Sequence, residues 1–402
     1  WTAEVLEGII PPSHRLSPLA SIFKKARILY GEAASVDLNS RCLKVKTIEN
    51  EALELLPYDQ LLIATGSRDH TERVPGMSQN GWTLKSEGDV IALRDHIGEV
   101  LRQAEMTNDV ASRERLMTFV IVGGGFTGVE VCAAIAEMLR KERRSYSCLR
   151  RQSPCIILTH SGPALLPHAQ VEKVSNYPQE QLINYGVDLR FGTRVTKVDR
   201  TGAFLSSGEI LPAATIVSTM GQTLIPLVGT EKLPRSDDGR LITDSNLRVY
   251  GAANLWAGGD VACVRRPGEN SPCPANALWA IQHGKLIGDN IARGIGGKNL
   301  RRFTFPGLGH AASFGIGKGF GELFGMQLTG WLPWIMRIFF FLYFMPSRTK
   351  AFRVALDCLL LPLDGWRGSR LSDSKEERSR RSSIVSHEQS IMCSSKAYSV
   401  GF

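Results

Sequence analysis

The sequence lacks the cysteine pattern of several protein classes. Its 402 residues hold eight cysteines, and no two of them stand at the C-x-x-C spacing of a zinc ribbon or a thioredoxin-like redox pair. So few cysteines in a chain of this length exclude a disulfide scaffold and favour a reducing compartment. We also expect no metal site.

The chain is equally poor in the features of disordered and of membrane-spanning proteins. Hydrophobic residues make up 43% of it, which is too many for a chain that is mostly disordered. Its most apolar segment, residues 331–345, would reach only about 22 Å as a helix, short of the ~30 Å hydrocarbon core of a bilayer. The length instead suits two or three domains, each with a core of its own.

Acidic residues are outnumbered by basic ones. The chain has 39 Asp and Glu against 48 Lys and Arg, a formal net charge of +9. Such an excess suggests an acidic partner, either nucleic acid or an anionic membrane. Because no basic stretch is interleaved with aromatic residues as in base-stacking proteins, we expect no nucleic acid as a partner.

Hydrophobic patterning predicts an α/β fold. Residues 117–122 and 155–159 are nearly continuous apolar runs, typical of strands buried on both faces of a parallel sheet. A helical pattern over about 127–143 lies between them, which completes a βαβ unit. The polar residues 107–115 predict a linker. Further strands are expected at 26–47 (an antiparallel meander), 61–64, 186–191, 195–199, 214–218 and 255–261, and further helices at 88–106 and about 275–293.

A glycine-rich turn joins the first strand of this unit to its helix. Gly123, Gly125 and Gly128 form the pattern G-x-G-x-x-G. The first glycine permits the tight turn, the second lets the backbone approach a pyrophosphate, and the third lets helix and strand pack closely. Free N–H groups and the helix dipole would then bind the phosphates. The turn predicts a dinucleotide site, against the alternative of a plain strand–helix turn.

The position expected to bind the ribose of this nucleotide holds a histidine. An acidic residue at the end of the second strand would bond to the adenosine hydroxyls, but His160 stands there. This removes the usual argument for NAD over NADP, and no Arg or Lys beside it supports NADP. Gly221, after the strand at 214–218, is expected to flank the nicotinamide nucleotide, or else to lie in an ordinary crossover.

Two further strand ends indicate a second nucleotide, a flavin. An Ala-Thr-Gly sequence ends one short apolar strand and a Gly-Asp sequence ends another. The aspartate could bond to ribityl or phosphate oxygens, and the N-terminus of the following helix could stabilise a reduced, negatively charged flavin. The residues expected at the flavin are Ala64, Thr65, Gly66, Gly259, Asp260 and Ala277.

The order of these motifs resembles that of the two-dinucleotide-domain flavoprotein reductases, and most of all the type II NADH:quinone oxidoreductases, or alternative NADH dehydrogenases. The resemblance covers about residues 1–365. It rests on the segments YDQLLIATG at 58–66, VIVGGGFTGVE at 120–130, LWAGGDV at 255–261 and ALWAIQHG at 277–284.

This resemblance implies two Rossmann-like dinucleotide-binding domains, with the NAD(P)H domain interrupting the FAD domain, and C-terminal membrane-associating helices. The implied parts are the FAD domain at 1–110 and 236–300, the NAD(P)H domain at 111–235 and a membrane-anchoring region at 301–365. Residues 366–402, rich in serine and poor in large apolar residues, predict a disordered tail. No G-x-G-x-x-G precedes residue 123. The FAD domain is therefore expected to lack its N-terminal βαβ unit, as in a truncated chain.

The resemblance also implies FAD and NAD(P)H as cofactors. A hydride would pass from NAD(P)H to the flavin and two electrons on to a membrane quinone, without proton pumping. Glu130 matches a family glutamate that faces the flavin, or else is only a carboxylate favoured by the helix dipole. Gln282 matches a glutamine of the quinone motif, or else is a surface residue. Leu278 replaces the first glutamine of that motif.

The apolar segment 331–345 favours a helix lying in a membrane surface, with a buried core helix as the alternative. Trp331, Trp334 and Tyr343 suit the headgroup level, and Arg337 with the basic residues after it could meet anionic lipid. The resemblance implies a peripheral protein docked through 331–365. The membrane would be the cytoplasmic face of a bacterial plasma membrane or the mitochondrial inner membrane, with a homodimer as one option.

Two other functions stay open. The chain could be a soluble NAD(P)H flavin reductase with another acceptor, or a degenerate, non-catalytic flavoprotein, which Leu278 and His160 both allow. A thioredoxin-reductase mechanism is disfavoured by the missing cysteine pair, and a sulfide:quinone reductase by the intact nicotinamide glycine turn.

Overall fold

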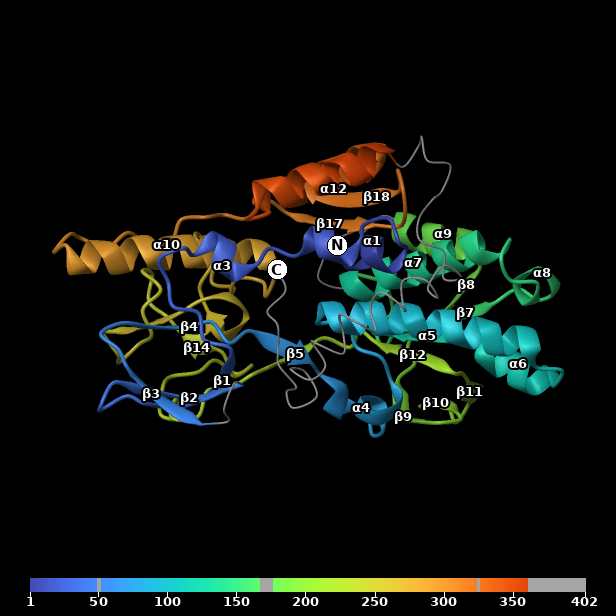
Figure 1. The fold of residues 1–402 in the computed structure, drawn as a ribbon, viewed down its shortest axis with the longest axis horizontal. Coiled ribbons are helices and arrows are strands. Elements are labelled where there is room, and N and C mark those ends of the chain that lie inside the picture. The colour runs from blue at the N-terminus through green and yellow to red at the C-terminus, as the bar shows by residue number, and fades with distance from the viewer. Residues whose placement is uncertain (49–51, 167–175, 324–325, 361–402) are drawn as a thin grey trace.

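The chain forms two α/β units that lie end to end, with the C-terminal helices along one side (Figure 1). The structure, a computed structural model, describes residues 1–48, 52–166, 176–323 and 326–360. The predicted α/β class is confirmed. The tail predicted at 366–402 and the last residues of the 301–365 region lie outside the described residues.

One unit contains a four-stranded parallel sheet in the order β12–β6–β7–β8. All five residues of β6 are buried, because side chains alternate between two covered faces. Phe119 and Ile121 enter the core shared with α5 and α7, whereas Val120 and Val122 enter the core shared with the antiparallel sheet β9–β10–β11. The predicted βαβ unit is confirmed.

The elements of this unit are β6 (Thr118–Val122), β7 (Cys155–Thr159), β8 (Val187–Arg190), β9 (Val195–Asp199), β10 (Gly202–Leu205), β11 (Ile210–Pro212) and β12 (Thr215–Ser218), with α4 (Met77–Asn80), α5 (Glu87–Met106), α6 (Val110–Leu116), α7 (Phe126–Glu142), α8 (Cys148–Arg151) and α9 (Tyr177–Asn184). The linker prediction at 107–115 is wrong over most of its length. Asp109 caps α6 by accepting the N–H of Ser112 at 2.8 Å, which stabilises a short polar helix.

The other unit combines the antiparallel meander β1–β2–β3 with the short parallel pairs β4–β15 and β14–β16. Its core holds Trp256 of β15, Ile63 of β4 and Ile287 of α10. The elements are β1 (Gly31–Asp37), β2 (Cys42–Thr47), β3 (Leu53–Pro57), β4 (Leu61–Ile63), β14 (Leu241–Ile242), β15 (Leu255–Ala257), the 3-10 turn η2 (Gly259–Val261), β16 (Ala262–Cys263) and α10 (Ala277–Ile295).

Two short antiparallel strands join the units. β5 (Ser67–Asp69), which the 3-10 turn η1 (Thr71–Arg73) follows, lies where the chain leaves the meander unit, and β13 (Gln222–Leu224) lies where it returns. The parallel-sheet unit is thus inserted into the other one, as the resemblance implied. The domain boundaries given above stay a prediction.

The two ends of the described chain meet beside α7. α1 (Thr2–Leu6), followed by α2 (Pro12–Arg15) and α3 (Leu19–Ile22), packs against α5 and α7. At the other end, the antiparallel sheet β17 (His310–Ser313), β18 (Gly319–Leu323), β19 (Met326–Gly330) packs against α11 (Trp331–Phe344), which α12 (Arg348–Leu360) follows. Pro333 stands in the first turn of α11, where proline does not break a helix. Within the described ranges, no helix is both long and apolar enough to cross a bilayer.

Candidate functional site

The glycine turn between β6 and α7 has the geometry that its spacing predicts. Gly123 has a φ of +121°, a conformation that favours glycine. A side chain at Gly128 would overlap the carbonyl oxygen of Gly123, so this glycine allows α7 to begin close to β6. Gly125, by contrast, has no atom within 4 Å of the place where a Cβ would stand. The backbone at Gly125 is therefore open to a ligand.

His160 lies directly beside this turn. Its Nδ1 accepts a hydrogen bond from the N–H of Gly124 at 3.2 Å, and its ring leaves no room for a side chain at Gly124. Its own N–H is bonded to the carbonyl of Arg190 at 2.8 Å. His160 thus occupies the predicted ribose-reading position at the end of β7. One N–H of the glycine turn is used by this bond, so fewer N–H groups are free for phosphate.

The loop after β12 lies against the glycine turn between β6 and α7. Thr219 Oγ1 lies 2.9 Å from the carbonyl oxygen of Val122 and 3.0 Å from that of Gly123, so the loop is held against the turn. Gly221, two residues on, has a φ of +94°, and its carbonyl accepts the N–H of His70 at 3.1 Å. Gly221, which is predicted to flank the nicotinamide, therefore stands two residues after the threonine that bonds to the glycine turn.

The strand ends predicted to hold the flavin are brought together. β4 and β15 pair in parallel, with Ile63 opposite Ala257, so their carboxyl ends meet at one edge of the sheet. Asp260 follows at this edge. Its Oδ2 accepts from Ser67 Oγ at 2.5 Å and lies 3.6 Å from Lys85 Nζ. Thr65 Oγ1 donates to the carbonyl of Ile225 at 2.9 Å.

These strand ends fit the ring and ribityl end of a flavin. Gly66 has nothing within 4 Å of its missing Cβ, and it and Gly259 take positive φ values, so the backbone can be approached closely. Ala277, the first residue of α10, is exposed. The chain has one G-x-G-x-x-G, and that turn lies in the other unit.

A buried histidine that the sequence reading missed ties α10 to this edge. His283 Nδ1 accepts the N–H of Gly259 at 3.2 Å, and burial lowers the pKa of the imidazole to about 4. The ring is therefore neutral at neutral pH, and Nε2 carries its proton. The sequence offered one sign of this role, namely that a histidine directly follows Gln282 within the predicted helix.

Gln282 is half buried on α10, near the C-terminal helices. One turn further along, Lys285 Nζ lies 6.0 Å from the ring centroid of Phe344 in α11. Leu278, at the position of the family's first glutamine, is buried in the core. The two positions of the quinone motif thus differ: Leu278 points into apolar packing, and Gln282 retains partial exposure.

Glu130 belongs to a buried cluster of charges. Its Oε1 lies 3.0 Å from Arg337 Nη2 and accepts the N–H of Ser313 at 2.9 Å, while Arg337 Nη1 also bonds to Glu4. Burial raises the pKa of Glu130, against the opposing effect of Arg337. The two carboxylates outweigh burial at Arg337 and raise its pKa above the usual value. The cluster joins α7, α1 and α11.

This cluster corrects one expectation about the membrane. The Arg337 side chain is only 4% exposed, so the prediction that it meets anionic lipid is wrong. No local pattern predicts this pairing, because Glu4, Glu130 and Arg337 are far apart along the chain. Whether Glu130 faces a flavin, as the resemblance implied, stays a prediction.

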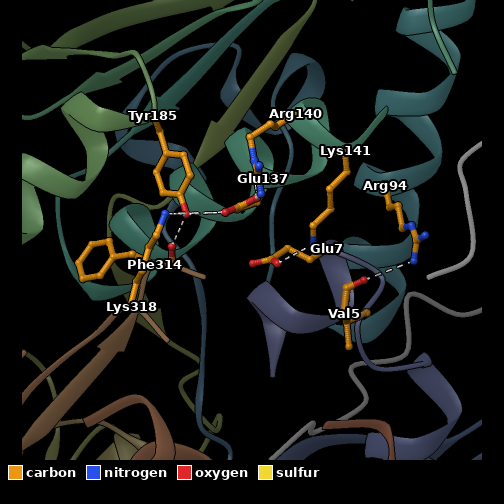
Figure 2. Close-up of polar contacts among 9 residues, drawn as sticks. All are labelled: Val5, Glu7, Arg94, Glu137, Arg140, Lys141, Tyr185, Phe314 and Lys318. Atoms are coloured by element: carbon orange, nitrogen blue, oxygen red, sulfur yellow. Dashed lines mark hydrogen bonds and ion pairs between the residues drawn. The ribbon is translucent and has the colours of Figure 1, made fainter. Parts of the chain in front are cut away.

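A second group of polar contacts continues along the same helix (Figure 2). Tyr185 Oη lies 2.7 Å from both Glu137 Oε1 and the carbonyl of Phe314, and it accepts from Lys318 Nζ at 2.9 Å. On the other side, Lys141 pairs with Glu7 of α1 at 3.2 Å. Burial raises the pKa of Glu7 to about 7. α7 is therefore fixed to both ends of the described chain. The structure shows no cluster of metal-ligating residues among those it describes.

Known proteins are similar to this chain in sequence and in fold. A sequence model of the family described as pyridine nucleotide-disulphide oxidoreductase matches residues 4–284. A type II NADH:quinone oxidoreductase of Mycobacterium tuberculosis is 27% identical over 86% of this chain and 76% of its own length, and that of Staphylococcus aureus is 25% identical over 82% and 81%. The solved NDH2 of Plasmodium falciparum in complex with NADH has the same fold, with a TM-score of 0.82, 18% identity and coverage of 92% and 91%.

Proposed function

The chain belongs to the pyridine nucleotide-disulphide oxidoreductase family, and we propose that it is a type II NADH:quinone oxidoreductase. It would pass a hydride from NAD(P)H to FAD and two electrons on to a membrane quinone, without pumping protons. The observation that carries this proposal is the pair of nucleotide sites in one chain. An open glycine turn at Gly125 stands in one unit, and the converging ends of β4 and β15 stand in the other.

The residues of the chain divide between the two nucleotides. The open backbone at Gly125 and the N-terminus of α7 bind the phosphates of NAD(P)H, with His160 at its ribose and Gly221 beside its nicotinamide end. Asp260, held by Ser67 and Lys85, orients the ribityl chain of FAD, and Ala277 lets the N-terminus of α10 approach the ring. When bound, FAD supplies the redox chemistry, which accepts a hydride and releases two electrons.

Glu130 and Gln282 are the proposed catalytic residues. Glu130 is a carboxylate whose pKa is raised by burial and whose charge is balanced by Arg337, so it can hold or release a proton as the flavin changes charge. Gln282 lies one turn from the contact between α10 and α11, which suits a quinone arriving from the side of the C-terminal helices. Leu278 would give this quinone an apolar rather than a polar neighbour.

The C-terminal helices support docking on a membrane surface. Along α11, the side chains of Trp331, Ile335, Phe339 and Tyr343 recur every four residues and are exposed, Phe339 to 68%. Phe352, Leu356 and Leu359 form the same kind of stripe on α12. Large apolar side chains that recur on an exposed face mark an interfacial helix. The cytoplasmic face of a bacterial plasma membrane, or the mitochondrial inner membrane, remains the predicted location.

One experiment tests the redox proposal. We expect the purified full chain to show flavin absorption and to oxidise NADH faster when a short-chain, water-soluble quinone is added. NADPH should be tried in parallel, because His160 leaves the preference open. Glu130→Gln should retain flavin and lose most quinone turnover, while the exposed Glu99→Gln on α5 serves as the matched control. Absence of bound flavin, or NADH oxidation that quinone does not change, would refute the proposal.

A further inference from the structure

A segment near the start of the chain exposes apolar side chains instead of burying them. Leu16, Leu19 and Phe23, in and around α3, are 43%, 42% and 54% exposed. Two exposed lysines, Lys24 and Lys25, follow directly. No acidic residue lies between positions 8 and 31. This combination of apolar side chains and adjoining basic ones is typical of segments that bind an anionic membrane surface.

The segment is attached to the C-terminal helices. α2, immediately before it, packs against α12: Lys350 Nζ donates to the carbonyl of Ser13 at 2.6 Å, and His14 Nδ1 lies 2.7 Å from Asp357 Oδ2. Asp357 is the single acidic residue of the sequence between 331 and 360. α3, α10 and α12 lie along one long side of the molecule (Figure 1). Residues 16–25 therefore follow directly on a helix that is fixed to α12.

We propose that residues 16–25 are a second membrane-docking element, which contacts an anionic bilayer beside α11 and α12. The inference rests on the proposed docking of those two helices. Leu16, Leu19 and Phe23 would enter the boundary of the acyl chains, and Lys24 and Lys25 would meet the lipid phosphates.

Charge favours lipid over a second copy of the chain as the occupant of this face. Lys24 and Lys25 are exposed, and so are the basic residues Arg348 and Arg353 of α12, the helix on which α2 packs. Two copies that met through this face would place like charges opposite each other, which is unfavourable, whereas an anionic leaflet complements them.

Docking through this segment has a consequence for the flavin unit. Residues 16–25 lead directly into β1 of the meander unit, whereas α11 is paired with α7 of the inserted unit through Arg337 and Glu130. A protein docked by α11 and α12 alone would be held at one end. With the second element, both units lie against the bilayer, and α10 with Gln282 stays at the lipid surface from which a quinone must come.

Vesicle flotation tests this element. The full chain, with flavin bound, would be mixed with vesicles of phosphatidylcholine alone or with about one third phosphatidylglycerol. Lys24→Gln/Lys25→Gln should weaken binding to the anionic vesicles about 30-fold, the loss expected for two lysines at such a surface. High salt should remove this difference, and phosphatidylcholine vesicles should show none. Phe23→Ser should weaken binding to both kinds of vesicle about tenfold.

Matched controls separate the inference from the proposed function. Lys44→Gln/Lys46→Gln removes the same charge from exposed positions on β2 and should leave binding unchanged. All variants should keep flavin absorption and turnover with a water-soluble quinone. If Phe339→Ser/Tyr343→Ser abolishes binding while the Lys24/Lys25 and Phe23 variants bind like the parent, the second element is refuted and C-terminal docking stands.

Two further outcomes would also overturn the inference. A parent chain that reduces soluble quinone but does not float with any vesicle contradicts both docking elements and leaves the redox proposal intact. Variants of residues 23–25 that change the molar mass in light scattering, but not vesicle binding, would assign this face to self-association instead.

Discussion

Replacing Arg337 by methionine should lower the free energy of unfolding by about 3–5 kcal/mol, the cost of leaving a buried charge without its partner. Arg337 is nearly inaccessible, and it compensates two carboxylates, Glu4 through a hydrogen bond and Glu130 at 3.0 Å. Methionine has a similar volume and no charge, so the cavity it creates is small. At about 2 °C per kcal/mol, the melting temperature should fall by roughly 6–10 °C.

The loss should depend on pH in a defined direction. The pKa of Glu130 is already raised by burial in the parent, and removing Arg337 removes the main effect that opposes this rise. A carboxyl group whose folded pKa exceeds its unfolded value favours folding below the unfolded pKa, and this advantage is lost as pH rises through the folded pKa. Arg337→Met should therefore be least harmful near pH 5 and most harmful at pH 8.

Thermal unfolding at pH 5 and pH 8 would measure this effect. Glu4→Gln/Glu130→Gln/Arg337→Met, which removes all three charges, should recover most of the stability at pH 8. Arg348→Met is the matched control, because that arginine is exposed and donates to the carbonyl of Tyr343, at 3.2 Å. A loss that is the same at both pH values, or a triple variant no more stable than Arg337→Met, would show that packing and not charge governs the cluster.

Three other substitutions follow from the same geometry. Glu7→Gln should flatten the pH dependence of urea unfolding: the pKa of Glu7 is raised to about 7 by burial, so the parent loses stability from about pH 4.5 to 7 as this group ionises. Gly128→Ala should cost about 1–3 kcal/mol and weaken NADH binding in fluorescence titrations, because the methyl group overlaps the Gly123 carbonyl. Gly284→Ala, on the open surface of α10, should leave NADH binding unchanged and raise stability by up to about 1 kcal/mol. His283→Phe should cost about 1–3 kcal/mol in thermal unfolding, since the Gly259 N–H loses its acceptor, and an unchanged melting temperature would contradict this role.

The parallel-sheet unit could be predicted because its signals are local. A strand that is buried on both faces is restricted to a few apolar residue types. Gly128 is required because a side chain there would overlap the carbonyl oxygen of Gly123, the first glycine of the same turn. The end of the next strand predicts the ribose-binding position, where His160 stands, and the structure shows His160 bonded to the N–H of Gly124. Its contact with the ribose stays a prediction. Features that depend on residues near one another in the sequence can be predicted from the spacing of residue types.

The remaining features depend on residues that are distant in sequence. Asp109 caps a short helix within a polar stretch. A single capping residue is a weaker indication of a helix than hydrophobic periodicity. Arg337 stands among aromatic residues, and its sequence neighbours suggest a lipid-facing side chain. Only the packing of α11 on β17–β19 turns it toward Glu130, and nothing in the local sequence specifies that packing.

The charge cluster also bears on how the chain reaches its native state during synthesis. Glu4 and Glu130 are made early and Arg337 is made more than two hundred residues after Glu130, so both carboxylates lack their counterion while most of the chain is on the ribosome. Burying them at that stage would be costly, which keeps α1 from settling onto α7 prematurely. The arrival of α11 removes this cost. The docking of α1 onto α7 therefore depends on a helix that lies more than three hundred residues further along the sequence.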